Sequence, residues 1–335
     1  MANIFFEEIE QTAITRIQKF AKIAAAYNFE IAVGFSGGKD SQVVHDLCKR
    51  AGIPFKAYYN VAFESATTKR FIRDNYPDVI WRRDYKVGFI ENIYKMHGGL
   101  LPTVEKAYCC ADYKHNPKYV DKCSITGVRR QESSKRATRT ALSFKNKSLM
   151  KQMLDKTSEY FVENCQSVGT ASVIQLLPIV DWSDADVWDY ILRHRLPVNG
   201  EYAMAKRVGC LVCPKANFSY NYKSLIRYPK LIDAFIRARE KASCDWMITS
   251  DNKDYSDDKV YYICRWLNHS FRPFTKRQMK EYESVKQTYL NSYEKEYSLC
   301  TRAAQARDIS TADEQLGVAE IAQKEVHCEP YLRGL

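Results

Sequence analysis

A glycine-rich segment near the N-terminus has the residue types that hold phosphate groups. It reads Ser36-Gly37-Gly38-Lys39-Asp40-Ser41 and lies between a predicted strand and a predicted helix. Paired glycines let backbone N–H groups approach an anion, and the first turn of the helix adds the positive end of its dipole. Lys39 contributes a charge, and the two serine hydroxyls can bond phosphate oxygens. The spacing fits neither GxxxxGK[ST] nor GxGxxG, which disfavours a Walker-type NTPase and a dinucleotide-dependent dehydrogenase.

Two pairs of cysteines, about a hundred residues apart, are candidate metal ligands. Cys109 and Cys110 are adjacent, whereas Cys210 and Cys213 form a C-x-x-C motif. Two such pairs can complete a site of four thiolates, which suits zinc and iron–sulfur clusters alike. Adjacent cysteines are poor joint ligands for one zinc ion, so a cluster of several irons is favoured over zinc. The alternative for Cys110 is a small buried hydrophobic side chain.

The elements that must position these residues alternate between strand and helix. Apolar runs predict strands at 29–35, 55–61, 79–82, 124–128 and 173–180. Helical spacing of apolar residues predicts helices at 5–27, 43–49, 67–75, 87–96 and 184–194, the last with Ser183 as its N-cap. This order predicts an α/β fold, a three-layer, doubly wound and mainly parallel sheet, with the nucleotide at the C-terminal ends of the strands.

The composition is that of a globular protein with anionic partners. The 335 residues are 45% hydrophobic and 27% charged, and 51 Lys and Arg against 40 Asp and Glu give a net charge of +11. No run approaches the roughly 20 apolar residues of a membrane-spanning helix. The acidic N-terminus lacks the order of a secretory signal. We therefore expect a cytoplasmic protein without a membrane partner, its eleven cysteines reduced or bound to metal.

Three regions are predicted: an N-terminal helix over 1–27, a nucleotide-binding domain over 28–220, and a helical, basic and Tyr-rich region over 221–335. Residues 114–156 contain twelve Lys and Arg against three Asp and Glu. With the aromatic residues of the C-terminal region, this basic stretch could bind nucleic acid. Tyrosines at helical spacing are more often core or interface residues, and that alternative stays open.

Several motifs together resemble the phosphoadenosine phosphosulfate (PAPS) reductase family of the PP-loop ATP pyrophosphatase superfamily, whose fold is adenine nucleotide alpha hydrolase-like. The glycine-rich segment matches the PP-loop, SGGxDS. The other motifs begin at Cys109-Cys110, at Gly127, at Pro178-Ile-Val-Asp181-Trp182 and at Arg207-Val-Gly209-Cys210. Together they span about residues 30–215.

The resemblance implies roles for particular residues. Ser36, Gly37, Gly38, Lys39, Asp40 and Ser41 would hold the pyrophosphate end of ATP with Mg²⁺, and Lys39, Asp40 and Ser41 would act in catalysis. Asn60 and Glu64 would lie near the adenine, and Gly127, Arg129, Arg130 and Arg136 would line the anion side of the pocket. Cys109, Cys110, Cys210 and Cys213 would ligate a 4Fe-4S cluster.

The leading interpretation is an ATP pyrophosphatase that adenylates an acceptor, releases pyrophosphate and supports sulfur transfer. The acceptor could be DNA, as in phosphorothioation, or tRNA, as in thiolation, and a cysteine desulfurase could supply the sulfur. One alternative is a sulfonucleotide reductase that forms sulfite from PAPS or adenosine phosphosulfate. This chain departs from the reductases in two ways. The reductases carry a degenerate phosphate loop, whereas this chain keeps a complete one. The reductases also end in a Glu-Cys-Gly-Leu/Ile-His segment with a nucleophilic cysteine, whereas the tail here reads His327-Cys328-Glu329-Pro330, which leaves Cys328 as a candidate nucleophile in a different context. A second alternative is a nucleotide- or nucleic-acid-binding subunit without catalysis.

Overall fold

A computed structural model describes residues 2–83, 87–115, 118, 120–157, 165–167, 172–203 and 205–292. The chain divides into two compact units. Unit 1 comprises Met1–Asp84 and Cys110–Cys210, and unit 2 comprises Tyr85–Cys109 and Leu211–Leu335. The glycine-rich segment therefore belongs to unit 1.

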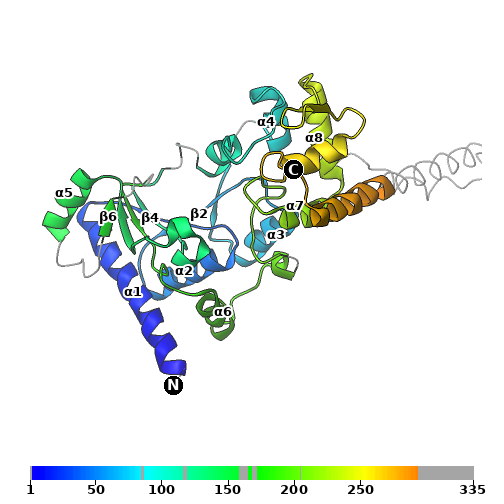
Figure 1. The fold of residues 1–335 in the computed structure, drawn as a ribbon. Helices are drawn as coiled ribbons and strands as arrows, with labels where there is room; N and C mark the ends of the chain where they lie inside the picture. The colour runs from blue at the N-terminus through cyan, green and yellow to red at the C-terminus, as the bar shows by residue number, and fades with distance from the viewer. Residues whose placement is uncertain are drawn as a thin grey trace, which may run out of the picture. The chain divides into compact units, whose positions relative to one another are not determined.

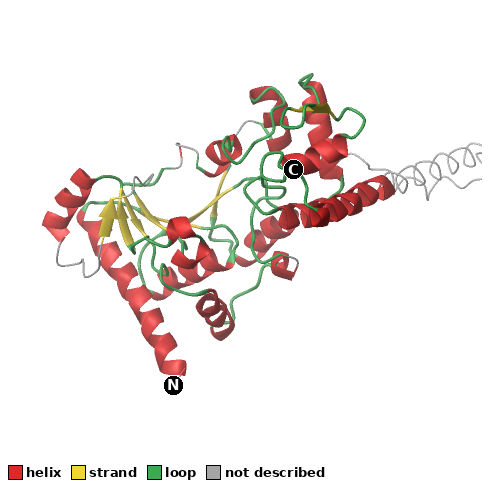
Figure 2. Ribbon diagram, viewed as in Figure 1, coloured by secondary structure: helices red, strands yellow, loops and turns green. Residues whose placement is uncertain are grey.

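Unit 1 is built on a sheet that has seven strands among the described residues (Figures 1 and 2). Its strands are β1 (Ile31–Gly34), β2 (Lys56–Asn60), β3 (Ile80–Arg82), β4 (Cys123–Ile125), β5 (Leu142–Phe144), β6 (Cys165–Ser167) and β7 (Ile174–Leu176). The order is β3-β2-β1-β4-β7-β5-β6, and every neighbouring pair is parallel except β5 with β7. The predicted α/β class with a mainly parallel sheet is confirmed. Because the chain winds outward from β1 in both directions, the sheet has a topological switch point between β1 and β4, where such folds bind ligands.

The helices of unit 1 cover the core with amphipathic faces. They are α1 (Ala2–Ala26), α2 (Lys39–Arg50), α3 (Ala66–Asn75), α5 (Lys147–Thr157) and α6 (Asp184–Arg193). Buried residues of these helices join those of the strands in one hydrophobic cluster, with Ile17, Val43 and Ile125 inaccessible to solvent. In Figure 1, α1, α2 and α6 lie on the same side of the sheet. The packing of α2 between α1 and α6 fixes where its first turn points.

Most elements agree with the sequence prediction, but the basic stretch does not. The helix predicted to start at 43 begins at Lys39, directly after the glycines. Within and just after 114–156 the structure has β5, α5 and β6, none of which was predicted. The strands β5 (Leu-Ser-Phe) and β6 (Cys-Gln-Ser) contain none of the β-branched residues that mark the predicted strands.

Unit 2 is helical with a small hairpin. Its helices are α4 (Phe89–Met96), α7 (Phe218–Arg227), α8 (Lys230–Lys241) and α9 (Lys259–Trp266), and residues 276–292 are also helical. The strands β8 (Met247–Ile248) and β9 (Lys253–Asp254) pair antiparallel. The ring of Phe235 on α8 lies 5.0 Å from that of Trp266, whose indole donates to the Pro102 carbonyl at 2.6 Å. None of the described helices is long and apolar enough to cross a membrane.

Candidate functional site

The glycine-rich loop joins the end of β1 to the start of α2 and is closed by its own serines. The Ser41 hydroxyl donates to the Gly38 carbonyl at 2.8 Å and accepts from the Ser36 N–H at 3.2 Å. The Gly38 N–H donates to Ser36 Oγ at 3.4 Å. These bonds curl the loop over the first turn of α2, where helix N–H groups lack carbonyl partners and can bind an anion.

Two glycines in and beside the loop cannot be replaced without a clash. Gly37 has φ +71°, and a Cβ there would lie 2.9 Å from Ile72 Cγ1. A Cβ on Gly127 would lie 2.7 Å from the carbonyl oxygen of Asp40. Gly37 therefore provides a left-handed turn that other residues adopt at a cost. Gly127 lets the segment after β4 approach the backbone of α2.

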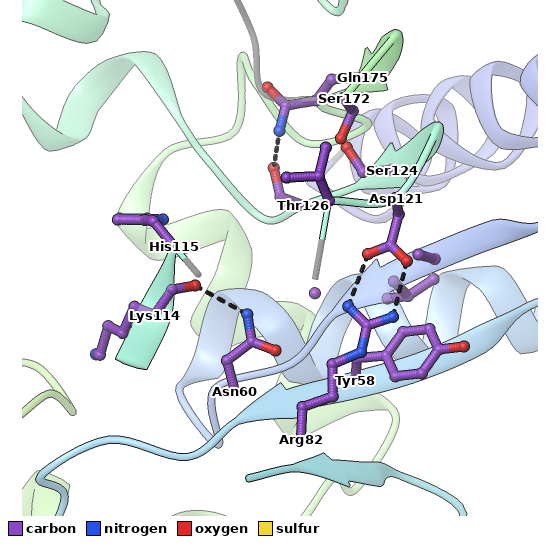
Figure 3. A pocket seen from close by; sticks show the side chains of 14 residues that line it. Tyr58, Asn60, Arg82, Lys114, His115, Asp121, Ser124, Thr126, Ser172 and Gln175 are labelled. Atoms are coloured by element: carbon purple, nitrogen blue, oxygen red, sulfur yellow. Dashed lines mark hydrogen bonds and ion pairs between the residues drawn. The ribbon is translucent and has the colours of Figure 1, made fainter. Parts of the chain in front are cut away.

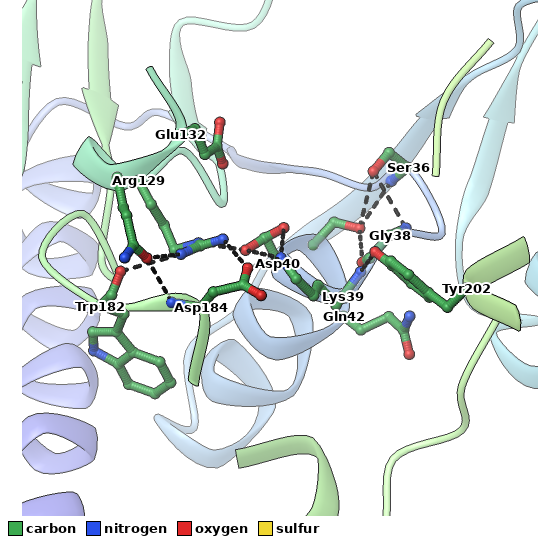
Figure 4. A network of polar contacts seen from close by, with 12 residues as sticks. Ser36, Gly38, Lys39, Asp40, Gln42, Arg129, Glu132, Trp182, Asp184 and Tyr202 are labelled. Atoms are coloured by element: carbon green, nitrogen blue, oxygen red, sulfur yellow. Dashed lines mark hydrogen bonds and ion pairs between the residues drawn. The ribbon is translucent and has the colours of Figure 1, made fainter. Parts of the chain in front are cut away.

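Four charged side chains meet beside the loop (Figure 4). Lys39 Nζ lies 3.1 Å from an oxygen of Asp40 and 2.9 Å from Asp184 Oδ1. Arg129 Nε lies 2.5 Å from Asp40 Oδ1, and its Nη2 lies 2.9 Å from the same Asp184 oxygen. Both cations are buried, with residue exposures of 6% for Lys39 and 3% for Arg129, whereas the Asp184 side chain is 57% exposed. We call these four residues the charged square; it contains two cations and two carboxylates.

The first turn of α6 presents Asp184 to this square. Ser183 caps the helix by accepting the Asp186 N–H, and Asp186 in return accepts the Ser183 N–H, which completes a capping box. The Asp184 N–H donates to Gln131 Oε1 at 2.7 Å. Partial burial alone would raise the pKa of Asp184, but hydrogen bonds and charge from Lys39 and Arg129 lower it. Asp184 is therefore a carboxylate held ionised by the cations of the loop.

A short segment, Gly200–Ala203 with the preceding Asn199, packs onto the loop from the other side. Asn199 Nδ2 donates to the Gly37 carbonyl at 3.0 Å. The Tyr202 hydroxyl accepts the Lys39 N–H at 2.9 Å, and burial raises the pKa of this phenol to about 12. A phosphate oxygen bound at the first turn of α2 would take that same N–H. The Tyr202 hydroxyl thus occupies a position that suits an anion.

Sequence analysis did not assign a role to Asp184, Asn199 or Tyr202. Asp184 stands at the start of a correctly predicted helix that follows a strand of the parallel sheet, and this position was the available signal. Asn199 and Tyr202 lie in a short segment whose contacts with the loop span more than 160 residues of sequence, so no local pattern marks them.

A pocket of about 190 Å³ lies against the strands next to the loop (Figure 3). Its lining residues come from the strands β1, β2, β3, β4 and β7 and from the segments that flank them, and they are mostly small or polar: Ala32, Val33, Gly34, Tyr58, Asn60, Arg82, Lys114, His115, Val120, Asp121, Ser124, Thr126, Ser172 and Gln175. Tyr58 and Asn60 alternate with core residue Tyr59, so the pocket lies on the sheet face away from the core. Arg82 closes one wall, paired to Asp121 at 2.7 and 2.8 Å.

Of the two residues predicted near the adenine, only Asn60 lines this pocket. Its Nδ2 donates to the Lys114 carbonyl at 2.9 Å. Glu64 is buried elsewhere and accepts from the Tyr59 hydroxyl at 2.9 Å. Its other oxygen lies 3.1 Å from Lys114 Nζ and 3.8 Å from Cys210 Sγ. Burial opposes charge on Lys114, but Cys210 and Glu64 raise its pKa.

The two other predicted arginines lie outside the charged square, although the charge of Asp40 acts on Arg136. Arg130 Nε donates to the Arg139 carbonyl at 2.7 Å, and Arg136 pairs with Glu132. Their predicted role at the anion site stays a prediction.

The predicted cysteine ligands are divided between the units. Cys110 and Cys210 belong to unit 1, and Cys109 and Cys213 to unit 2. Among the described residues, no three His, Cys, Asp or Glu side chains form a group that could hold a metal ion. Cys328 lies outside the described residues.

Comparison with known proteins places these features in a family. A model of the phosphoadenosine phosphosulfate reductase domain matches residues 30–216. An uncharacterized protein of Methanocaldococcus jannaschii is 25% identical over 252 residues, covering 71% of this chain and 54% of that protein, so the chain spans about half of its length. Sulfate adenylyltransferase subunit 2 of Rhizobium sp. (strain N33) is 24% identical over 213 residues, covering 61% of this chain and 70% of that protein. The crystal structure of a PAPS reductase from Candida auris, in complex with phosphate, aligns at a TM-score of 0.42 and 15% identity over 61% of this chain and 93% of that one.

Proposed function

Since the chain belongs to the phosphoadenosine phosphosulfate reductase domain family, we propose that it binds ATP at the glycine-rich loop and cleaves it between the α- and β-phosphates. The observation that carries this proposal is the complete loop at the N-terminus of α2, with Lys39 and Arg129 buried beside it. Backbone N–H groups, a helix dipole and two cations together suit the β- and γ-phosphates of a triphosphate.

The proposed reaction transfers the adenylyl group. An oxygen of the acceptor attacks the α-phosphorus, the bond from that phosphorus to the bridging oxygen of the β-phosphate breaks, and pyrophosphate leaves with the electron pair. Lys39 and Arg129 stabilise the charge that develops on the leaving pyrophosphate, which is the main demand of such a transfer. Asp40 would hold the Mg²⁺ that accompanies ATP, because carboxylate oxygens suit this ion.

The pocket beside the loop is the proposed site of the nucleoside. It begins at Gly34, two residues before the loop, and continues along β2 and β4 to Asn60 and Thr126. A nucleotide with its phosphates on the loop could place its base here, at the switch point of the sheet.

Release of pyrophosphate from ATP tests the proposal. We expect Lys39→Ala to abolish it, because the charge next to the leaving group is lost. Lys49→Ala is the matched control: this residue is on the same helix, and its 52%-exposed side chain pairs with Asp78 on the surface. Equal loss in both variants, or turnover unchanged by Lys39→Ala, would contradict the proposed role of the loop.

The finer part of the proposal is sulfur transfer with a 4Fe-4S cluster. The donor set fits such a cluster chemically, since thiolates are its usual ligands, and Cys109, Cys110, Cys210 and Cys213 would hold it. When bound, such a cluster would carry sulfur that a cysteine desulfurase supplies, and DNA or tRNA would be the acceptor.

Anaerobic purification tests this part by iron content and visible absorbance. Cys210→Ser should lose both, and Cys165→Ser, a half-buried cysteine of β6, should keep them. Iron retained in Cys210→Ser would remove that ligand from the proposal.

A sulfonucleotide reductase is the second candidate, favoured by the family model itself. It predicts sulfite from PAPS or adenosine phosphosulfate and no pyrophosphate from ATP. Both products can be measured on the same sample, so one preparation separates the two candidates.

A further inference from the structure

We propose that Asp184 determines the specificity of the phosphate site. Because of Asp184, the glycine-rich loop accepts pyrophosphate groups as Mg²⁺ complexes and rejects the metal-free anion. The inference rests on the proposed function, since it concerns the same phosphate site. It starts from the charged square of Lys39, Asp40, Arg129 and Asp184 (Figure 4).

Asp184 contacts both cations through one oxygen. Its Oδ1 lies 2.9 Å from Lys39 Nζ and 2.9 Å from Arg129 Nη2. Asp40 contacts the same two residues, at 3.1 and 2.5 Å. Each of the two cations therefore contacts both carboxylates, and the two positive charges are balanced by two negative charges before any ligand binds. The square as a whole has no net charge to offer an anion.

A metal-free pyrophosphate brings several negative charges to this neutral square. It is attracted by Lys39 and Arg129 but repelled by Asp40 and Asp184, whose oxygens lie within 3.1 Å of those cations, in a partly buried setting where charges act strongly. In an Mg²⁺ complex the repulsion by the carboxylates is replaced by attraction, because the metal ion is attracted to both Asp40 and Asp184. Two carboxylates beside two cations thus favour the complex over the bare anion.

Asp184 and Asp40 belong to different elements of the fold. Asp40 belongs to the loop motif itself, whereas Asp184 arrives from the first turn of α6 with its side chain 57% exposed. Its carboxylate can be changed without altering the loop or the capping box, which uses Ser183 and Asp186. This makes Asp184 the position at which the discrimination can be tested.

The test is calorimetric binding of inorganic pyrophosphate to the full chain, once with excess Mg²⁺ and once with EDTA. For wild type we expect clear binding with Mg²⁺ and weaker binding without it. Asp184→Asn gives the square a net positive charge, so metal-free pyrophosphate should bind about tenfold more tightly or better. The ratio of the two affinities should then shrink. Asp184→Glu keeps the charge and should keep the wild-type ratio.

Asp189→Asn is the matched control. Asp189 lies on the same helix and pairs with Arg193 at 2.7 Å, outside the square. The ratio of the pyrophosphate affinities with Mg²⁺ and with EDTA should therefore be the same in Asp189→Asn as in wild type. An Asp184→Asn ratio equal to wild type would overturn the inference and leave the proposed function standing. Equal weakening of both affinities in Asp184→Asn would also overturn it, because Asp184 would then only position Lys39. A folded wild type that binds pyrophosphate under neither condition would overturn the proposed function and this inference with it.

Discussion

Replacing Gly127 by alanine should damage both the stability of unit 1 and the phosphate site. The new Cβ would lie 2.7 Å from the carbonyl oxygen and 2.8 Å from the carbonyl carbon of Asp40. Ordinary contact begins at 3.4 Å, so the two backbones must separate by about 0.7 Å. Both contacts are with backbone, which cannot rotate away as a side chain can. Overpacking of this kind costs about 1–3 kcal/mol.

The same displacement should reach the charged square. Asp40 is in the first turn of α2, and Arg129 is two residues beyond Gly127, so moving one backbone from the other lengthens their 2.5 Å contact. Charge-assisted hydrogen bonds weaken steeply with such a change. We therefore expect Gly127→Ala to lower the free energy of unfolding by about 1–3 kcal/mol and pyrophosphate affinity by about tenfold.

Denaturant unfolding and calorimetric binding of pyrophosphate with Mg²⁺ measure the two effects. Gly52→Ala is the control, because Gly52 has φ +68° at the far end of α2 and a Cβ there meets nothing within 4 Å. It should lose about 1–2 kcal/mol through its left-handed backbone and keep its affinity. If Gly127→Ala keeps both its stability and its affinity, the close approach to α2 is not a constraint and the reasoning fails.

Other changes test single contacts. Tyr202→Phe frees the Lys39 N–H for a phosphate oxygen, so calorimetry should show pyrophosphate bound at least as tightly as by wild type; a tenfold loss would contradict this. Ser183→Ala removes the cap of α6 and should cost about 1 kcal/mol in denaturant unfolding; an unchanged midpoint would mean that the cap is not needed. Burial lowers the pKa of His45 although Asp78 opposes this, so the unfolded chain, with a value near 6.5, takes up a proton that the native chain does not. The free energy of unfolding should therefore fall as the pH drops from 7 to 5, and His45→Gln should flatten this dependence; an equal slope in both proteins would exclude His45 as its source.

The loop and its supporting elements could be predicted because their signals are local. A strand ends, two glycines follow and a helix begins within ten residues, and each of these leaves a pattern in composition or period. The structure confirms β1 at Ile31–Gly34 and α2 directly after the loop. The N-cap at Ser183 is local in the same sense, and the capping box confirms it.

The partners of the loop could not be predicted because they come from distant segments. Asp184 is about 145 residues from Lys39 and Tyr202 about 163, and nothing near either residue points to the loop. Glu64 stays a prediction near the adenine, but its burial could not be foreseen either. The sequence places Glu64 just after β2, whereas its hydrogen bonds with the Tyr59 hydroxyl and the Ala62 N–H, which bury its carboxylate, appear only in the structure.

The topology explains which basic residues can serve the phosphate site. Lys39, Arg129 and Asp184 follow β1, β4 and β7, three adjacent parallel strands whose C-terminal ends lie at one edge of the sheet. β5 runs antiparallel to β7, so its C-terminal end lies at the opposite edge, and α5 begins there three residues later. The stretch 114–156 is therefore not one basic surface. Arg129 belongs to the nucleotide edge, whereas Lys147 and Lys151 start from the other. A polyanion that binds α5 would thus neutralise charge that the phosphate site does not use, and removing those lysines should leave pyrophosphate affinity unchanged.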